Sequence, residues 1–249
     1  MLLLLWEQSP QVIAILACPH RQSFRIPLMS STAQQSRQGM LKITEIFHSL
    51  QGEARDAGRP TVFVRLTGCP LRCVYCDSEY AFHGGEWIHI DEIIQQVAAY
   101  ETPYVCVTGG EPLAQKRCLE LLDKLCDAGY QVSLETSGAV DISGVDERVS
   151  RVLDLKTPDS GEQERNLWSN LDVLTPHDQV KFVICSRGDY EWAVEVLQSR
   201  GLPDRDVLFS PAWGDLDAAE LAAWVLKDRL NVRVQLQLHK ILWGDVPGK

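Results

Sequence analysis

The feature that most constrains the fold is a regular alternation of two kinds of segment from Met40 onward. Short runs rich in Val, Ile, Leu and Phe predict β-strands, and longer segments with apolar residues three and four positions apart predict helices. The predicted strands cover residues 61–67, 104–108, 131–135, 151–155, 179–185, 206–209 and 232–238. The predicted helices cover residues 90–101, 115–128, 190–200 and 216–230.

Glycines mark the ends of two of these helices. Gly129 and Gly201 stand directly after them, where a left-handed glycine commonly caps a helix. Alternating strands and helices imply a mostly parallel sheet joined by crossover helices. Because complete strand–helix pairs are too few for a closed eightfold barrel, we predict an α/β fold in the form of an open, partial TIM-like β/α barrel. In such barrels the site forms at the C-terminal ends of the strands.

Composition fits one domain. The chain has 249 residues, 45% of them hydrophobic, and a formal net charge of −10. This charge argues against a broad electrostatic contact with nucleic acid or an anionic membrane, so we expect neither partner. Residues 1–39 combine short apolar runs, which lack a preceding basic residue, with a polar stretch. We expect 1–39 to be a disordered or non-native extension, Met40 the natural start, and 40–249 the catalytic domain.

Three cysteines carry the strongest chemical signal. Cys69, Cys73 and Cys76 form the pattern Cys-x3-Cys-x2-Cys directly after a predicted strand. Three thiolates on one short loop can hold three irons of a [4Fe–4S] cluster and leave the fourth iron open for a small molecule. The alternative is a zinc site whose fourth ligand lies elsewhere, for example His83 or Cys106.

The cysteines of the predicted strands and helices have a different interpretation. Cys106, Cys118, Cys126 and Cys185 occur singly in apolar patterns, as small core residues do. This distribution favours a reducing, cytoplasmic compartment over a disulfide-rich secreted fold.

Polar residues follow successive predicted strands. Thr108 to Pro112 read Thr-Gly-Gly-Glu-Pro, and residues 135–138 and 154–158 end the next two strands. Glycine permits close approach of backbone to a ligand, and the C-terminal strand ends of a barrel meet at one mouth. We therefore expect these segments to line one cavity, together with Lys181 of the following strand.

The cysteine spacing, followed by Gly-Gly-Glu, resembles that of the radical S-adenosylmethionine (SAM) enzymes and implies a barrel of the radical SAM type. In that superfamily the Gly-Gly-Glu element contacts the methionine amino group of SAM. The resemblance therefore implies a SAM site made of these residues: Tyr75, Asp77, Gly109, Gly110, Glu111, Ser137, Asp154, Lys156 and Lys181.

Further motifs narrow the resemblance. They are Phe47-x-Ser49-x-Gln51-Gly52-Glu53, an arginine (Arg65) before the cysteines, Cys76-Asp77-Ser78 after them, and Gln237-x-His239-Lys240 near the end. In this order they resemble the 7-carboxy-7-deazaguanine synthases, from Met40 almost to the C-terminus. Two positions depart from that pattern: Ser78 replaces a commoner threonine, and Ala54 replaces the second glycine of Gln-Gly-Glu-Gly.

This resemblance implies a carbon–nitrogen lyase. It would convert 6-carboxy-5,6,7,8-tetrahydropterin to 7-carboxy-7-deazaguanine, with ring contraction and loss of ammonia, in the biosynthesis of queuosine and other 7-deazapurines. The implied cofactors are a [4Fe–4S] cluster, SAM and Mg2+, with the hydroxyl of Ser78 as an oxygen ligand of Mg2+. The implied partners are a flavodoxin-like or other one-electron donor and a second copy of the chain in a homodimer.

The implied substrate-binding residues are Leu50, Gln51, Gly52, Glu53, Arg65, Thr108 and His239. Gln51 and Glu53 carry the donors and acceptors that a pterin edge requires, and Arg65 can hold the substrate carboxylate by two hydrogen bonds. Two alternatives remain at this stage. One is a glycyl-radical-enzyme activase, which shares the cysteine spacing, and the other is a non-catalytic zinc-binding module.

Overall fold

A computed structural model describes residues 37–202, 204–244, 246 and 248. The predictions for residues 1–36 lie outside these described residues. From residue 37 onward the chain forms one compact unit, which begins with a turn at residues 37–39. None of the helices described has the length and apolar character needed to cross a membrane.

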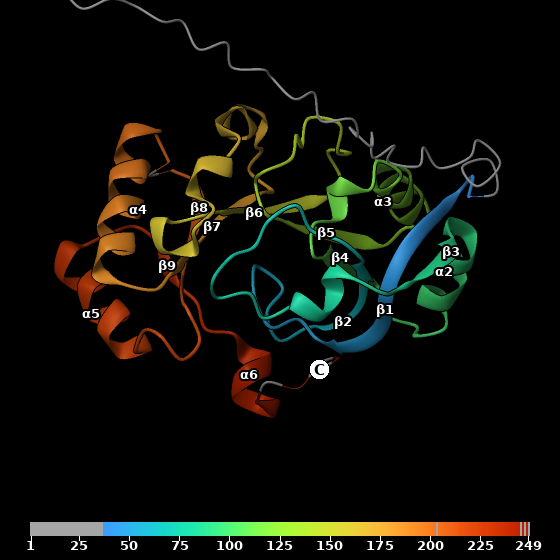
Figure 1. Cartoon of the computed structure of the whole chain (residues 1–249), viewed down its shortest axis with the longest axis horizontal. Coiled ribbons are helices and arrows are strands. Elements are labelled where there is room, and N and C mark those ends of the chain that lie inside the picture. The colour runs from blue at the N-terminus through green and yellow to red at the C-terminus, as the bar shows by residue number, and fades with distance from the viewer. Residues whose placement is uncertain (1–36, 203, 245, 247, 249) are drawn as a thin grey trace, which may run out of the picture. The chain divides into compact units, whose positions relative to one another are not determined.

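One nine-stranded sheet organises this unit (Figure 1). Its strands are β1 (Met40–Leu50), β2 (Pro60–Leu66), β3 (Glu86–His89), β4 (Tyr104–Gly109), β5 (Gln131–Thr136), β6 (Ser150–Leu155), β7 (Gln179–Ile184), β8 (Asp206–Pro211) and β9 (Arg233–Val234). They lie in the order β3-β1-β2-β4-β5-β6-β7-β8-β9. The strands from β2 to β9 are parallel, apart from β3, and β1 is antiparallel to β2 and β3. Because β3 and β9 are the two edges, the sheet is an open barrel, as predicted.

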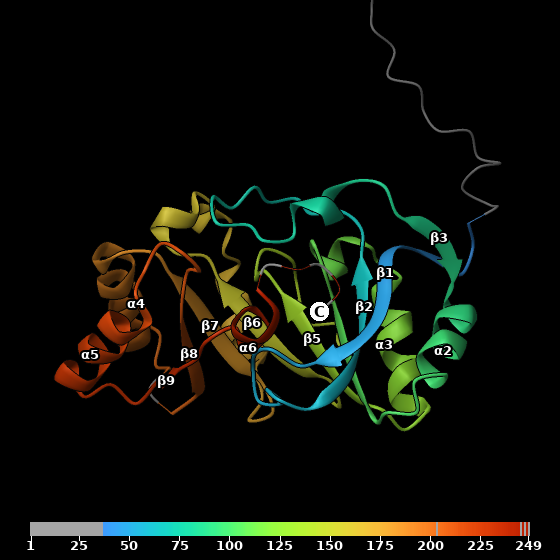
Figure 2. The same cartoon turned by 90° about the horizontal axis from the view of Figure 1, so that it is seen from below.

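Helices lie at both ends of the row of strands. Figure 2 shows α2 (Ile90–Ala98) and α3 (Cys118–Asp127) near β1 to β4, and α4 (Arg187–Ser199) and α5 (Ala218–Asp228) near β7 to β9. The short helix α6 (Leu238–Trp243) follows β9. The 3-10 helices are η1 (Glu79–Phe82), η2 (Pro112–Ala114), η3 (Pro158–Ser160), η4 (Gln163–Arg165) and η5 (Trp168–Val173), and the last three occupy the β6–β7 connection instead of an α-helix.

The two faces of the sheet differ because side chains alternate along each strand. On β2, Val62, Val64 and Leu66 are completely buried in the main hydrophobic core. The helices pack their apolar sides into the same core, through residues such as Ile93, Leu121, Ala193 and Leu221. The other face of the sheet carries polar residues. They are unusual there, because strands of a parallel sheet are usually apolar on both faces.

Most predicted boundaries are confirmed within a few residues. Gly129 (φ 89°) and Gly201 (φ 65°) adopt the left-handed conformation expected of helix caps. The third predicted helix (190–200) begins earlier than predicted, as α4 at Arg187, because the side chain of Ser186 accepts a hydrogen bond from the Asp189 amide and caps it. Strands β1 and β3 have no counterpart among the predicted strands. Both are antiparallel, with partly exposed residues that weaken the apolar pattern.

The predicted strand at 232–238 was wrong beyond its first residues. Only Arg233 and Val234 pair with β8. The side chain of Gln235 then bonds to the backbone of Ala54, accepting from its amide at 2.8 Å and donating to its carbonyl at 3.0 Å. The Gln235 amide still donates to the Phe209 carbonyl of β8 at 3.0 Å, and α6 begins at Leu238.

Candidate active site

The polar face of the sheet lines a cavity of about 720 Å3. The strand side chains on its wall include Phe63, Arg65, Thr108, Glu135, Asp154, Lys181 and Ser210. They alternate with the core residues described above, for example Arg65 between Val64 and Leu66. One face of the sheet therefore packs in the hydrophobic core, and the other face lines the cavity. This explains why polar residues occur on its strands.

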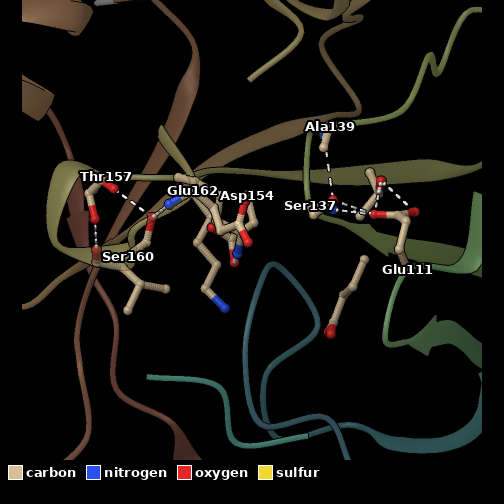
Figure 3. A network of polar contacts seen from close by, with 12 residues as sticks. Glu111, Ser137, Ala139, Asp154, Thr157, Ser160 and Glu162 are labelled. Carbon is tan, nitrogen blue, oxygen red and sulfur yellow. Dashed lines mark hydrogen bonds and ion pairs between the residues drawn. The ribbon is translucent and has the colours of Figure 1, made fainter. Parts of the chain in front are cut away.

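The loop that joins β2 to η1 (residues 67–78, the cysteine loop) forms another wall. Cys69, Cys73 and Cys76 all lie on the cavity. The connection after β6 holds this loop in place: the Ser160 carbonyl accepts from the Val74 amide at 3.0 Å, and Glu162 accepts from the Arg72 amide. Figure 3 shows Ser160 next to Thr157 and Glu162 in this connection.

The three thiols are close enough to influence one another. Burial raises the pKa of all three, and that of Cys73 rises to about 11, with Cys76 and Cys69 adding to the shift. Iron binding would therefore release protons from them.

Among the described residues, no three His, Cys, Asp or Glu side chains form a group that could hold a single metal ion. Neither His83 nor Cys106 lines the cavity that the three cysteines share, so the geometry does not support the zinc alternative.

Gly109 and Gly110 lie on the cavity where β4 meets the cysteine loop. A Cβ at position 109 would be 2.4 Å from the Leu66 carbonyl oxygen, and one at position 110 would be 2.5 Å from that of Gly68. Only glycine fits such an approach. Gly109 is therefore required by its contact with the end of β2 and Gly110 by its contact with the cysteine loop, independently of any ligand.

Glu111 lies behind this wall rather than on it. Its carboxylate is completely buried and accepts hydrogen bonds from the Leu113 amide, the Thr136 hydroxyl, and the amide and hydroxyl of Ser137. Figure 3 shows Glu111 next to Ser137. The distances run from 2.6 to 3.0 Å. Glu111 thus joins the ends of β4 and β5, and its predicted contact with SAM stays a prediction.

Lys156 and Lys181 are two of the lysines that line the cavity. The Lys156 ammonium lies 3.0 Å from Asp154 Oδ2 and 5.8 Å from the centre of the Tyr75 ring. Burial lowers the pKa of Lys156, but Asp154, Tyr75 and Cys73 raise it by more, so the net shift is upward. Lys156 therefore carries its charge beside the cysteine loop.

The second lysine connects two predicted sets of residues. The Lys181 ammonium, assigned to SAM by resemblance, lies 2.5 Å from Oε2 of Glu53, assigned to the substrate. Burial lowers the pKa of Lys181, but Glu53 and Asp154 raise it by more. The pair keeps Glu53 in place and leaves its other oxygen, Oε1, without a hydrogen bond.

The sequence interpretation placed Glu135 in a segment expected to line the cavity but assigned it no role of its own. Its carboxylate accepts from the Gln51 side-chain amide at 3.4 Å and from the Thr108 hydroxyl at 3.1 Å. It therefore joins two of the predicted substrate-binding residues. The available signal was its place at the C-terminal end of a predicted strand.

The C-terminal segment closes one side of the cavity. Gln237 and Lys240 contact Oδ2 of Asp77 at 3.2 and 3.3 Å, and Ser78 donates to Oδ1 at 2.9 Å. Burial raises the pKa of Asp77, but Lys240, Ser78 and Gln237 lower it by more, to about 2. His239 and Leu50 also line the cavity.

A family model described as "Radical SAM superfamily" matches residues 63–209. The "7-carboxy-7-deazaguanine synthase" of Koribacter versatilis is 46% identical over 82% of this chain and 97% of that protein. The protein of the same name from Chlorobaculum tepidum is 43% identical over 84% of this chain and 97% of that protein.

The chain belongs to the 7-carboxy-7-deazaguanine synthases, within the radical SAM superfamily.

Solved structures support the fold. QueE from Escherichia coli matches 85% of this radical SAM chain and 100% of that chain, with a TM-score of 0.64 at 23% identity. SuiB from Streptococcus suis matches 68% of this chain and 47% of that chain, with a TM-score of 0.51 at 15% identity. Both likenesses bear on the fold alone, and they confirm the predicted open barrel of the radical SAM type.

The cavity of this synthase has the chemistry that its superfamily's cofactors require. Four buried side-chain oxygens have no hydrogen-bond partner in the described structure: Glu53 Oε1, Tyr75 OH, Asp154 Oδ1 and Ser210 Oγ. All four residues line the cavity that the three cysteines share. Buried polar atoms normally have partners, so these four indicate a polar ligand. A [4Fe–4S] cluster and SAM, the cofactors of the superfamily, fit this donor set.

Proposed function

We propose that this enzyme converts 6-carboxy-5,6,7,8-tetrahydropterin to 7-carboxy-7-deazaguanine, with loss of ammonia. The observation that carries the proposal is the convergence of three loop thiols and four unpartnered buried oxygens on one cavity. Family membership supplies the reaction, and the cavity supplies the means to position both SAM and a polar ring system.

The thiolates of Cys69, Cys73 and Cys76 would hold three irons of the cluster. When bound, the reduced cluster and SAM supply a 5′-deoxyadenosyl radical that can abstract a hydrogen atom from the substrate. The backbone of Gly109 and Gly110 lines the space next to the cysteine loop, as expected for contact with SAM.

Four residues around that space present polar groups that SAM can use. Tyr75 and Asp154 each offer an unpartnered oxygen, Lys156 offers a buried positive charge, and Ser137 lines the same wall. Lys156 suits the carboxylate of SAM, and Asp154 suits a hydroxyl or amino group.

The substrate would lie next to the side chains of Gln51, Glu53 and Thr108. Oε1 of Glu53 is a buried acceptor without a partner, which suits the N–H groups of a pterin edge. Arg65 offers a guanidinium to the substrate carboxylate. His239, Leu50 and Gly52 complete the cavity wall on that side. By enclosing the ring, these residues orient the substrate and exclude water from the radical step.

Further features of the reaction rest on family likeness. Ser78 is proposed as the Mg2+ ligand, because its proton is donated to Asp77 and its lone pairs remain available for a hard cation. A flavodoxin-like or similar one-electron donor, a homodimer and a cytoplasmic location are parts of the same proposal.

The test is anaerobic reconstitution with iron and sulfide, followed by incubation with SAM, a reductant, Mg2+ and the carboxylated pterin. We expect a brown protein with about four irons per chain, and formation of the deazaguanine. Cys73→Ala should abolish SAM cleavage and leave the fold intact. Colourless protein that binds zinc, or cluster-loaded protein that cleaves SAM without using the pterin, would contradict the proposal.

A further inference from the structure

Arg65 has a partner that the family motifs do not include. Glu45 of β1 lies directly opposite Arg65 of β2 in the antiparallel register. Oε1 of Glu45 accepts a hydrogen bond from Nε of Arg65 at 2.7 Å. Both side chains are mostly buried, with 24% of Glu45 and 14% of Arg65 exposed. The ion pair is therefore a cross-strand contact shielded from solvent.

Tyr80 contacts the same carboxylate oxygen. Its hydroxyl donates to Oε1 of Glu45 at 2.8 Å. The guanidinium carbon of Arg65 lies 5.7 Å from the ring centre of Tyr80 and 5.7 Å from that of Phe47. Phe47 is itself stacked on Phe63 at 4.9 Å. Two aromatic rings and one carboxylate thus restrict the guanidinium.

This arrangement leaves one recognition surface on Arg65. A guanidinium can hold a carboxylate through its two terminal amino groups or through Nε and one terminal group. Glu45 occupies Nε, and within the described part of the chain neither terminal amino group has a hydrogen-bond acceptor. Arg65 lines the cavity, whereas Glu45 does not. The paired terminal groups are therefore what Arg65 can offer a ligand.

We infer that Glu45 and Tyr80 are positioning residues that direct Arg65 toward the substrate carboxylate. The inference rests on the proposed function, in which Arg65 binds that carboxylate. Glu45 determines which N–H groups of the guanidinium are available to a ligand, and the hydrogen bond from Tyr80 holds the Glu45 carboxylate in place. Because Tyr80 lies in η1, directly after the cysteine loop, it also connects that loop to the recognition of the carboxylate.

The test compares two ligands on anaerobically reconstituted protein. One is the 6-carboxylated tetrahydropterin, and the other is tetrahydropterin without the carboxylate. Glu45→Ala should raise the Kd of the carboxylated ligand about tenfold, the effect of weakening one charge-assisted hydrogen bond. It should leave the Kd of the other ligand unchanged. Tyr80→Phe should act in the same direction by about two- to fivefold.

Several controls separate positioning from general damage. Glu191→Ala removes a similar contact, Arg187 Nε to Glu191 Oε1 at 2.9 Å, on the exposed side of α4, and should change neither Kd. The affinity for SAM and the formation of 5′-deoxyadenosine without substrate should stay the same in Glu45→Ala. In an Arg65→Ala background, Glu45→Ala should have no further effect.

The outcomes distinguish a failure of the role of Glu45 and Tyr80 from a failure of the proposed function. Equal changes for both ligands, or no change for either, would overturn the role of Glu45 and Tyr80. A wild-type enzyme that does not bind the carboxylated pterin would instead overturn the proposed function. Glu45→Gln keeps the shape and an acceptor oxygen but removes the charge. It gives the same comparison, with a smaller effect, if Glu45→Ala does not fold.

Discussion

Gly52 lies in direct contact with the imidazole of His239, and any Cβ at position 52 would be 2.0 Å from Nδ1 of that ring. The Leu238 amide also donates to the Gly52 carbonyl at 3.0 Å. The loop after β1 and the start of α6, far apart in the sequence, thus form one wall of the cavity. The glycine of the Gln-Gly-Glu motif is required here by packing.

Gly52→Ala should therefore displace His239 and lower the affinity for the pterin by at least about tenfold, because small displacements in a site have large effects. Iron content and SAM cleavage without substrate should be unchanged, since among the described residues no hydrogen bond joins Gly52 to the cysteine loop. Gly188→Ala is the matched control: its new Cβ would be 3.5 Å from the nearest atom, and it should behave as wild type. Normal pterin affinity in Gly52→Ala would contradict the assigned role of His239.

Glu111→Ala should destabilise the fold as well as the SAM site. The change leaves buried donors of Leu113, Thr136 and Ser137 without their acceptor, so the free energy of unfolding should fall by at least about 2 kcal/mol. Urea unfolding of the reconstituted protein and the Kd for SAM would measure both effects. If the Kd rises strongly while the unfolding midpoint stays the same, Glu111 contacts SAM directly.

Much of the fold could be predicted from the sequence because its parallel strands are apolar and its helices have regular spacing. The missed strands β1 and β3 lie on the antiparallel side, where Glu45, Phe47 and their neighbours are partly exposed. Residues 235–238 were predicted as strand but lie outside it. There the Gln235 side chain bonds to the backbone of Ala54, a long-range contact that no local pattern encodes. Local periodicity therefore predicts the parallel part of the sheet better than its two edges.

The motif residues of the candidate site could be predicted from the sequence, but the residues that contact them could not. The cysteines and glycines are visible because chemistry requires them at fixed spacing. Glu45 and Glu135 act through side-chain contacts across neighbouring strands, and a single sequence does not reveal them. Ala54, where the family pattern has glycine, has φ 63°, a left-handed conformation that glycine adopts without strain.

Ser78→Ala should weaken the response of the reaction to Mg2+. With the hydroxyl removed, the cation loses its proposed side-chain ligand, and the Mg2+ concentration for half-maximal rate should rise at least about tenfold. Ser78→Thr, which keeps the oxygen, should retain the wild-type response. SAM cleavage in the absence of pterin should be unaffected by either change. An unchanged Mg2+ response in Ser78→Ala would place the ion elsewhere, or remove it from the reaction.

The Arg151–Asp178 pair lies at the N-terminal ends of β6 and β7, away from the C-terminal strand ends that line the cavity. On that side of the sheet it should dominate the loss of stability in acid. Asp178 accepts from Arg151 Nε at 3.0 Å and from the Arg151 amide at 2.8 Å, and both side chains are buried. Burial raises the pKa of Asp178, but hydrogen bonds from Arg151 and Thr175 lower it by more, so the net shift is downward. Asp178→Ala would leave the Arg151 charge buried without a partner. At pH 7 this should reduce the free energy of unfolding by about 3–5 kcal/mol.

The lowered pKa of Asp178 determines how its contribution to stability changes with pH. The folded-state pKa of Asp178 lies below its ordinary value of about 3.9, so its contribution is complete above about pH 5 and is lost as the pH falls below about 4. In urea unfolding, the difference between wild type and Asp178→Asn should therefore be constant from pH 7 to about 5 and shrink below about 4. Asp123, whose pKa is raised by burial and by nearby Asp146, is the control. Wild type should gain stability relative to Asp123→Asn on acidification. A difference for Asp178→Asn that does not depend on pH would show that the carboxylate contributes through its shape rather than its charge.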